Sequence, residues 1–173
     1  MSDSGARINW ELLTRTLRPE NSPGFLLWQV ANQWQRRQRA ALDPIGITHV
    51  QFILLAGLGY LQEKHGVVTQ ARLAQFCKTD AMMTSQVLRT LERQALVART
   101  KHPSDQRAKS LLLTEGGKAV LNKAMPVVLA CDGQVFGVLG DDGSRALVDS
   151  LRSMWAAHAD GTDEAVPQPV EGP

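Results

Sequence analysis

Residues 79–114 read TDAMMTSQVLRTLERQALVARTKHPSDQRAKSLLLT, and this stretch decides the fold of the chain. Asp80 is placed to cap a helix, because its carboxylate can accept hydrogen bonds from the unpaired N–H groups of a first turn. The residues predicted to face inward from this helix recur at helical spacing and are Thr84, Val87, Leu88, Leu91 and Ala95. The opposite face is expected to carry Met82, Ser85, Gln86, Arg89 and Arg93. This mixture of hydrogen-bonding and cationic groups suits a helix that reads base edges and contacts phosphates in the DNA major groove.

A β-hairpin is predicted directly after this helix. Two short extended runs, 96–101 and 108–113, flank a turn rich in Pro, Ser and Asp. Asp105 stands two residues before Arg107, so its carboxylate can orient the guanidinium toward a narrow, electronegative minor groove. Positive charge is concentrated here, because residues 69–109 hold eight basic and three acidic side chains, or +5, while the whole chain carries only +2.

Helices are predicted on both sides of this stretch. Upstream, Pro23 begins a helix that reaches about Leu42, and a Thr48–Gln51 capping box begins a strongly apolar helix that ends at residues 65–66. A minimal strand at 67–68 and a helix at 70–78 follow. Downstream, Thr114 begins a long helix that extends to about residue 140, and a last helix is expected at 145–159.

The stretches LAQFCKTDAMMTSQVLRTLERQALVART and HPSDQRAKSLLLTEGGKAV resemble the winged helix-turn-helix of the MarR family of bacterial transcriptional regulators. The most specific parts are the D-x-R of the hairpin, the LTEGGK at 113–118 and the LERQALV at 91–97. The resemblance continues upstream through GITHVQFILLAGL and, in less detail, over residues 23–158. It implies a mainly α fold with a small β-hairpin wing (α+β), flanked by dimerisation helices at both ends of the chain.

The domain organisation expected on this basis has four parts. Residues 1–47 form an N-terminal segment and dimerisation helix, 48–114 the winged helix-turn-helix DNA-binding domain, and 115–159 the C-terminal dimerisation helices. Residues 160–173 are acidic and rich in Pro and Gly, which predicts a disordered tail.

Matching positions in the resembled family, together with the local charge, indicate the DNA-binding residues. They are Arg72, Lys78, Thr79, Met82, Met83, Ser85, Gln86, Arg89, Arg93, Arg107 and Lys109, with Asp105 supporting the wing. Many relatives carry small hydroxyl residues at the two methionine positions, so Met82 and Met83 would touch thymine methyl groups instead, unless Met83 belongs to the core. The alternative reading of Arg107 is a solvated hairpin charge.

A homodimer and a small-molecule effector are also expected. The outer helices carry apolar stripes that the small winged core cannot cover, so a second copy should bury them and place two recognition helices roughly 34–36 Å apart on a palindromic operator. The resemblance implies a repressor released by a small aromatic or phenolic acid that binds between the dimerisation helices and the winged domain. The candidate lining residues are Trp28, Asn32, His49 and Phe52. Alternatively, Trp28 and Phe52 are plain core and His49 is solvated.

Other classes of protein fit less well. Cys77 and Cys131 are far apart and predict neither a disulfide nor a metal site. Cys77 should pack as a small hydrophobe. Thiol-based redox sensing by Cys131 or Cys77 is an alternative function, with Cys131 expected to be the better exposed of the two. A winged helix that binds only protein is a second alternative. The chain shows no catalytic or cofactor-binding motif, no signal peptide and no apolar segment expected to span a bilayer, so we expect a cytoplasmic protein that is not an enzyme.

Overall fold

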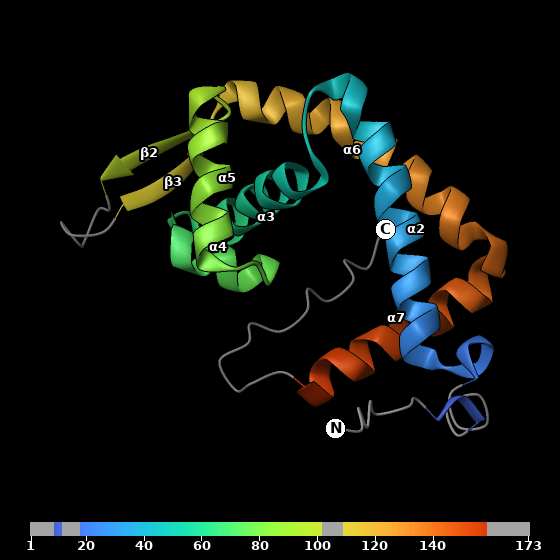
Figure 1. Ribbon diagram of the computed structural model, residues 1–173. Coiled ribbons are helices and arrows are strands. Elements are labelled where there is room, and N and C mark those ends of the chain that lie inside the picture. The colour runs from blue at the N-terminus through green and yellow to red at the C-terminus, as the bar shows by residue number, and fades with distance from the viewer. Residues whose placement is uncertain (1–8, 12–17, 102–108, 159–173) are drawn as a thin grey trace, which may run out of the picture. The chain divides into compact units, whose positions relative to one another are not determined.

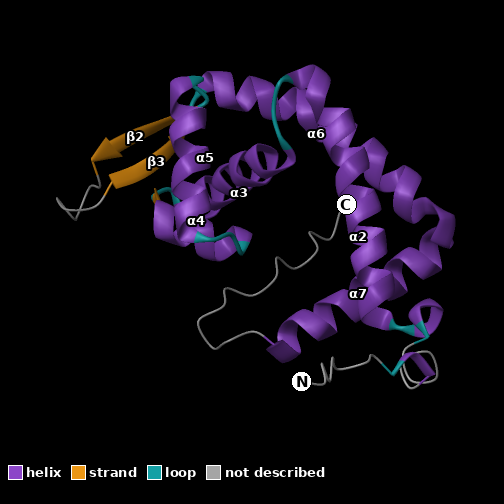
Figure 2. Cartoon of the chain, viewed as in Figure 1, coloured by secondary structure: helices purple, strands orange, loops and turns teal. Residues whose placement is uncertain are grey.

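The computed structural model describes residues 9–11, 18–101 and 109–158 (Figure 1). They belong to two compact units, residues 1–37 and residues 38–173, and each unit is described by itself. Asp105, Arg107 and the tail at 160–173 lie outside the described residues. Helices account for most of the described chain, and a small sheet completes it (Figure 2).

The first unit holds a short 3-10 helix, η1 (Pro19–Asn21), and most of helix α2 (Pro23–Leu42). Helix α2 begins and ends where the sequence predicted, with proline at its first position. Ser22 Oγ accepts a hydrogen bond from Phe25 N at 3.4 Å, and the rings of Phe25 and Trp28 stack with centroids 6.1 Å apart. Several large apolar side chains of α2 are exposed in the single chain, namely Phe25, Leu26, Leu27, Trp28 and Val30.

Helix α3 (His49–His65) lies at the centre of the second unit, after the 3-10 turn η2 (Asp43–Ile45). The predicted capping box is present, because Thr48 Oγ1 accepts from Gln51 N at 3.2 Å while Gln51 Oε1 accepts from Thr48 N at 2.8 Å. The side chains of α3 that are fully inaccessible to solvent are Leu54, Leu55, Leu58 and Leu61. This helix contacts α4, α5, α6 and the sheet, which confirms that the apolar helix forms the core.

The sheet has three antiparallel strands in the order β1-β3-β2. They are β1 (Val68–Thr69), β2 (Val97–Lys101) and β3 (Lys109–Leu113). The hairpin is therefore present, and the predicted minimal strand pairs with it, although one residue later than expected. Its register places Val68 opposite Leu111, and Leu113 opposite Val97.

Helices α4 (Gln70–Cys77) and α5 (Ala81–Arg93) form the predicted helix-turn-helix. Thr84, Leu88 and Leu91 are buried and Val87 is half-buried, as predicted for the inward face of α5. The prediction for Ala95 is wrong, because α5 ends at Arg93 and Ala95 is exposed in the left-handed region, with φ 56°. That conformation lets Ala95 N donate to Glu92 O and Leu96 N donate to Leu91 O, each at 2.9 Å. The two bonds make a Schellman motif in which alanine stands where glycine is usual.

Helix α6 (Glu115–Phe136) begins at Thr114, whose Oγ1 accepts from Gly117 N at 3.0 Å. A Cβ added to Gly117 would lie 2.2 Å from Leu96 O, so the start of α6 packs directly on the backbone that follows α5. The long helix ends earlier than predicted and is followed by η3 (Gly137–Leu139). Helix α7 (Gly140–His158) then begins five residues earlier than predicted. Asp141 and Asp142 therefore occupy its first turn, where their negative charges interact favourably with the positive end of the helix dipole.

Candidate nucleic-acid interface

The N-terminus of α5 is fixed by a compact set of local hydrogen bonds. Asp80 Oδ1 accepts from Met82 N at 2.8 Å and from Met83 N at 2.9 Å, which confirms the predicted cap. The buried Thr84 hydroxyl donates to Asp80 O and lies 2.8 Å from Thr79 Oγ1. The turn between α4 and α5 is therefore tied to the inner face of α5, and the Thr79 hydroxyl takes part in that tie.

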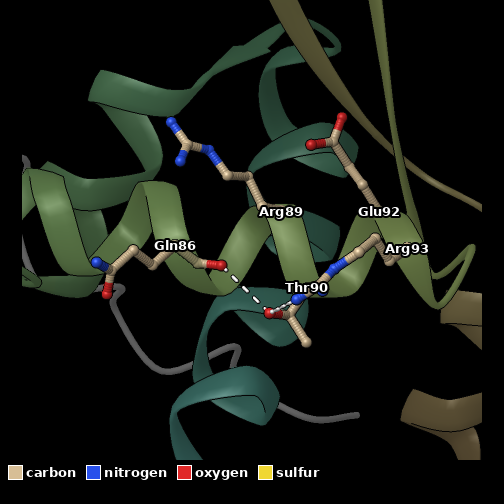
Figure 3. A pocket seen from close by; sticks show the side chains of 5 residues that line it. All are labelled: Gln86, Arg89, Thr90, Glu92 and Arg93. Carbon is tan, nitrogen blue, oxygen red and sulfur yellow. Dashed lines mark hydrogen bonds between the residues drawn. The ribbon is translucent and has the colours of Figure 1, made fainter.

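The outer face of α5 is open and carries cationic and amide groups. Gln86, Arg89 and Arg93 are exposed there, Ser85 is half-buried, and 73 % of the Met82 surface is accessible. Met83 is 38 % exposed, so it is not a core residue. An open depression on this face is lined by Gln86, Arg89, Thr90, Glu92 and Arg93 (Figure 3). Arg93 Nη2 donates to Thr90 Oγ1 at 3.1 Å, which holds the guanidinium along the helix.

Further cations flank this helix. Arg72 on α4 is half-buried, and Lys109 is exposed at the first residue of β3, opposite Lys101 on β2. Lys78 is exposed and ends α4 in the left-handed region, with φ 50°. Its ammonium lies 5.5 Å from the ring centroid of Trp155 on α7, within the range of a cation–π interaction. Helix α4, the turn and α5 thus bring most of the predicted DNA-binding residues into one unit.

A cross-connection that the sequence analysis missed joins this face to the sheet. Arg99 on β2 places its Nε 3.2 Å from Glu92 Oε1 on α5, and its Nη2 donates to Gln70 Oε1 on α4 at 3.3 Å. From the sequence alone, Arg99 is only one of the eight basic residues at 69–109. The signal that could have found it is Glu92, the one acidic residue in the segment Ala81–Arg93.

The four candidate effector-binding residues divide between the two units. Trp28 and Asn32 belong to the first unit, where Asn32 Nδ2 donates to Trp28 O at 2.8 Å. Trp28 is 63 % exposed, so in the single chain it is not core, whereas Phe52 is 6 % exposed and belongs to the core of the second unit. His49 is half-buried rather than solvated. Burial lowers its pKa, the nearby charge of Arg39 lowers it further, and the negative charge of Asp132 acts in the opposite direction.

The cysteines have packing roles in this fold. Cys77 is half-buried and its Sγ lies 3.7 Å from Ile53 O, and burial raises the pKa of the thiol to about 11. The thiolate is the reactive form, so Cys77 is a poor nucleophile near neutral pH. The expectation that Cys131 is the better exposed cysteine is wrong, because only 5 % of its surface is accessible.

A model of the MarR family matches residues 47–109. An HTH-type transcriptional regulator of Bacillus subtilis, YdcH, is 44 % identical over 118 residues, which cover 68 % of this chain and 80 % of the relative. A transcriptional repressor of Mycobacterium tuberculosis, Rv2887, is 33 % identical over 67 % of this chain and 81 % of its own length.

The fold is also similar to that of solved structures. CouR from Rhodococcus jostii RHA1, bound to p-coumaroyl-CoA, is 27 % identical with a TM-score of 0.70, and the match covers 90 % of this chain and 100 % of that chain. The repressor CouR bound to a 23-mer DNA duplex gives a TM-score of 0.69 at 24 % identity, over 86 % of this chain and 99 % of that one.

Proposed function

Because this chain belongs to the MarR family of transcriptional regulators, we propose that it is a cytoplasmic homodimeric repressor that binds a palindromic operator and is released by a small-molecule effector. The observation that carries the proposal is the outer face of α5, where Gln86, Arg89 and Arg93 are exposed on a helix whose inner face is locked into the core. Gln86 can read adenine through two hydrogen bonds, and the arginines can take guanine or phosphate.

The dimer is proposed from the apolar surface of the C-terminal helices. An 18-residue window within residues 115–157 reaches a mean hydropathy of 1.2, yet only 17 % of it is buried inside the chain. By length and composition alone this segment could span a bilayer, so the expectation that no segment is apolar enough to do so is wrong. Leaving such a surface in water costs about 25 cal/mol per Å². We propose that a second copy of the chain covers this surface. The exposed side chains that it would bury include Leu129, Leu151 and Trp155.

The effector is proposed to be a small aromatic or phenolic acid. The similarity to CouR supports the aromatic part of this proposal, since that regulator was solved with p-coumaroyl-CoA, a CoA thioester of a phenolic acid. Trp28, Asn32 and His49 remain our candidates for contacting the effector. Phe52 is buried in the core and would only form part of the wall behind the effector. Effector binding would favour a spacing of the two recognition helices that does not match the operator, so that DNA is released.

A salt series on DNA beside the protein's own gene tests the DNA-binding proposal. We expect specific affinity to fall on the order of 10³-fold or more between 50 and 200 mM salt if six or more phosphates are contacted. A scrambled duplex of equal length is the control for specificity. A flat salt response would instead favour the protein-only winged helix, and a footprint repeated with aromatic acids would identify the effector class.

A further inference from the structure

Helix α5 carries one negative charge on a face that otherwise presents cations. Glu92 lies in the last turn of α5 and lines the same depression as Arg89 and Arg93. An unpaired carboxylate beside bound DNA would repel the phosphates, and like-charge juxtaposition at an interface is strongly unfavourable. This position therefore needs a partner for Glu92 if the face is to bind DNA tightly.

Arg99 supplies that partner from the first half of the hairpin. Its Nε lies 3.2 Å from Glu92 Oε1, within ion-pair distance although not aligned for a hydrogen bond, and the two side chains are 26 % and 28 % exposed. Figure 3 shows the Glu92 carboxylate on the same side of α5 as the Arg89 guanidinium, whereas the Arg93 side chain lies along another side toward Thr90. The bond from Arg99 Nη2 to Gln70 Oε1 holds the guanidinium from a second direction.

We propose that Arg99 is a positioning residue that neutralises Glu92 on the DNA-binding face and holds its carboxylate against β2, rather than a residue that contacts phosphate itself. The same guanidinium bridges β2 to the first residue of α4 and the last turn of α5, so the base of the wing is fastened to both helices of the helix-turn-helix. This inference rests on the proposed DNA-binding function of the α5 face.

The two roles for Arg99 predict different salt dependences. Loss of a phosphate contact lowers the slope of log affinity against log salt by about one per contact, and thus by about two in a dimer. Loss of a positioning charge leaves the number of contacted phosphates unchanged. Removing both partners of an ion pair is also often nearly neutral for stability, whereas removing one leaves an uncompensated charge.

The experiment is a double-mutant cycle on full-length protein, with Arg99→Met, Glu92→Gln and the double variant. Operator affinity is measured by fluorescence anisotropy at four salt concentrations, and circular dichroism checks that each variant is folded. We expect Arg99→Met to bind about tenfold more weakly, Glu92→Gln to bind severalfold more tightly, and the double variant to recover to within about twofold of wild type with an unchanged salt slope. Arg93→Ala is the matched control, expected to lower the slope by about two.

Several results would overturn the inference. They are an Arg99→Met variant that binds as tightly as wild type, a double variant as weak as Arg99→Met, or a double variant whose slope falls by about two. If Arg99→Met does not fold, the double variant still decides through its affinity and slope. Failure of wild-type protein to bind any duplex would count against the proposed function itself, whereas binding by wild type with no recovery in the double variant would refute only the role of Arg99.

Discussion

Replacing Ala95 with glycine should stabilise the protein, although helix-rich proteins usually lose stability when glycine is introduced. Ala95 adopts φ 56° directly after α5. A left-handed conformation costs an L-residue with a Cβ roughly 1–2 kcal/mol, which glycine does not incur. The greater conformational freedom of glycine in the unfolded chain offsets about 0.5–1 kcal/mol of that stabilisation. Because the alanine side chain is exposed, little packing is lost, and the net gain should be about 0.5–1 kcal/mol.

Thermal and urea unfolding at fixed protein concentration measure this gain, which corresponds to an increase in Tm of about 1–4 °C for a chain of this size. The matched control is Ala119→Gly at an exposed position inside α6, where glycine should destabilise by about 1 kcal/mol. The hydrogen bond from Thr114 Oγ1 to Ala95 O, at 2.7 Å, uses only the backbone of residue 95 and should survive. If both glycine variants lost stability equally, the strain attributed to Ala95 would be absent.

Two further predictions concern packing and pH. Gly117→Ala should destabilise by about 3 kcal/mol or more, because the new Cβ would meet Leu96 O at 2.2 Å and backbone would have to shift, and a urea midpoint equal to that of wild type would contradict this. Burial lowers the pKa of His49 below 6.5 in the folded protein, so the unfolded chain binds the proton more readily. The stabilisation from neutral His49 is therefore present above pH 6.5 and is lost as the pH falls through the pKa of His49 in the folded protein. Urea unfolding at several pH values should therefore show a smaller acid loss in His49→Gln, and an equal loss would assign the effect to another group.

The features predicted well from the sequence are those fixed by residues close together in the chain. Thr48, Asp80 and Thr114 each cap a helix by accepting from a backbone N–H two or three residues ahead, so residue type and spacing were sufficient. The inner face of α5 followed from helical periodicity for the same reason.

The errors lie at the ends of helices and at contacts between distant elements. Helical spacing predicts that the inner stripe reaches Ala95. The hydrogen bond from Leu96 N to Leu91 O instead closes the helix, and Ala95 adopts the left-handed conformation there. The residues Asp141, Asp142, Gly143 and Ser144 resemble a turn before a helix, yet α7 already includes them. The Arg99–Glu92 pair joins a strand to a helix and corresponds to no regular spacing, and the burial of Cys131 depends on how α6 packs.

The cation–π contact between Lys78 and Trp155 gives the protein an internal optical reporter. Lys78 ends the first helix of the helix-turn-helix, and the indole belongs to the last helix, so the contact spans two distant segments of sequence. Indole emission responds to nearby charge, and any shift of the ammonium toward a nucleic acid backbone would alter the light emitted by Trp155. Comparing the full-length protein with Trp155→Phe would isolate that signal from the other three tryptophans, without an attached dye.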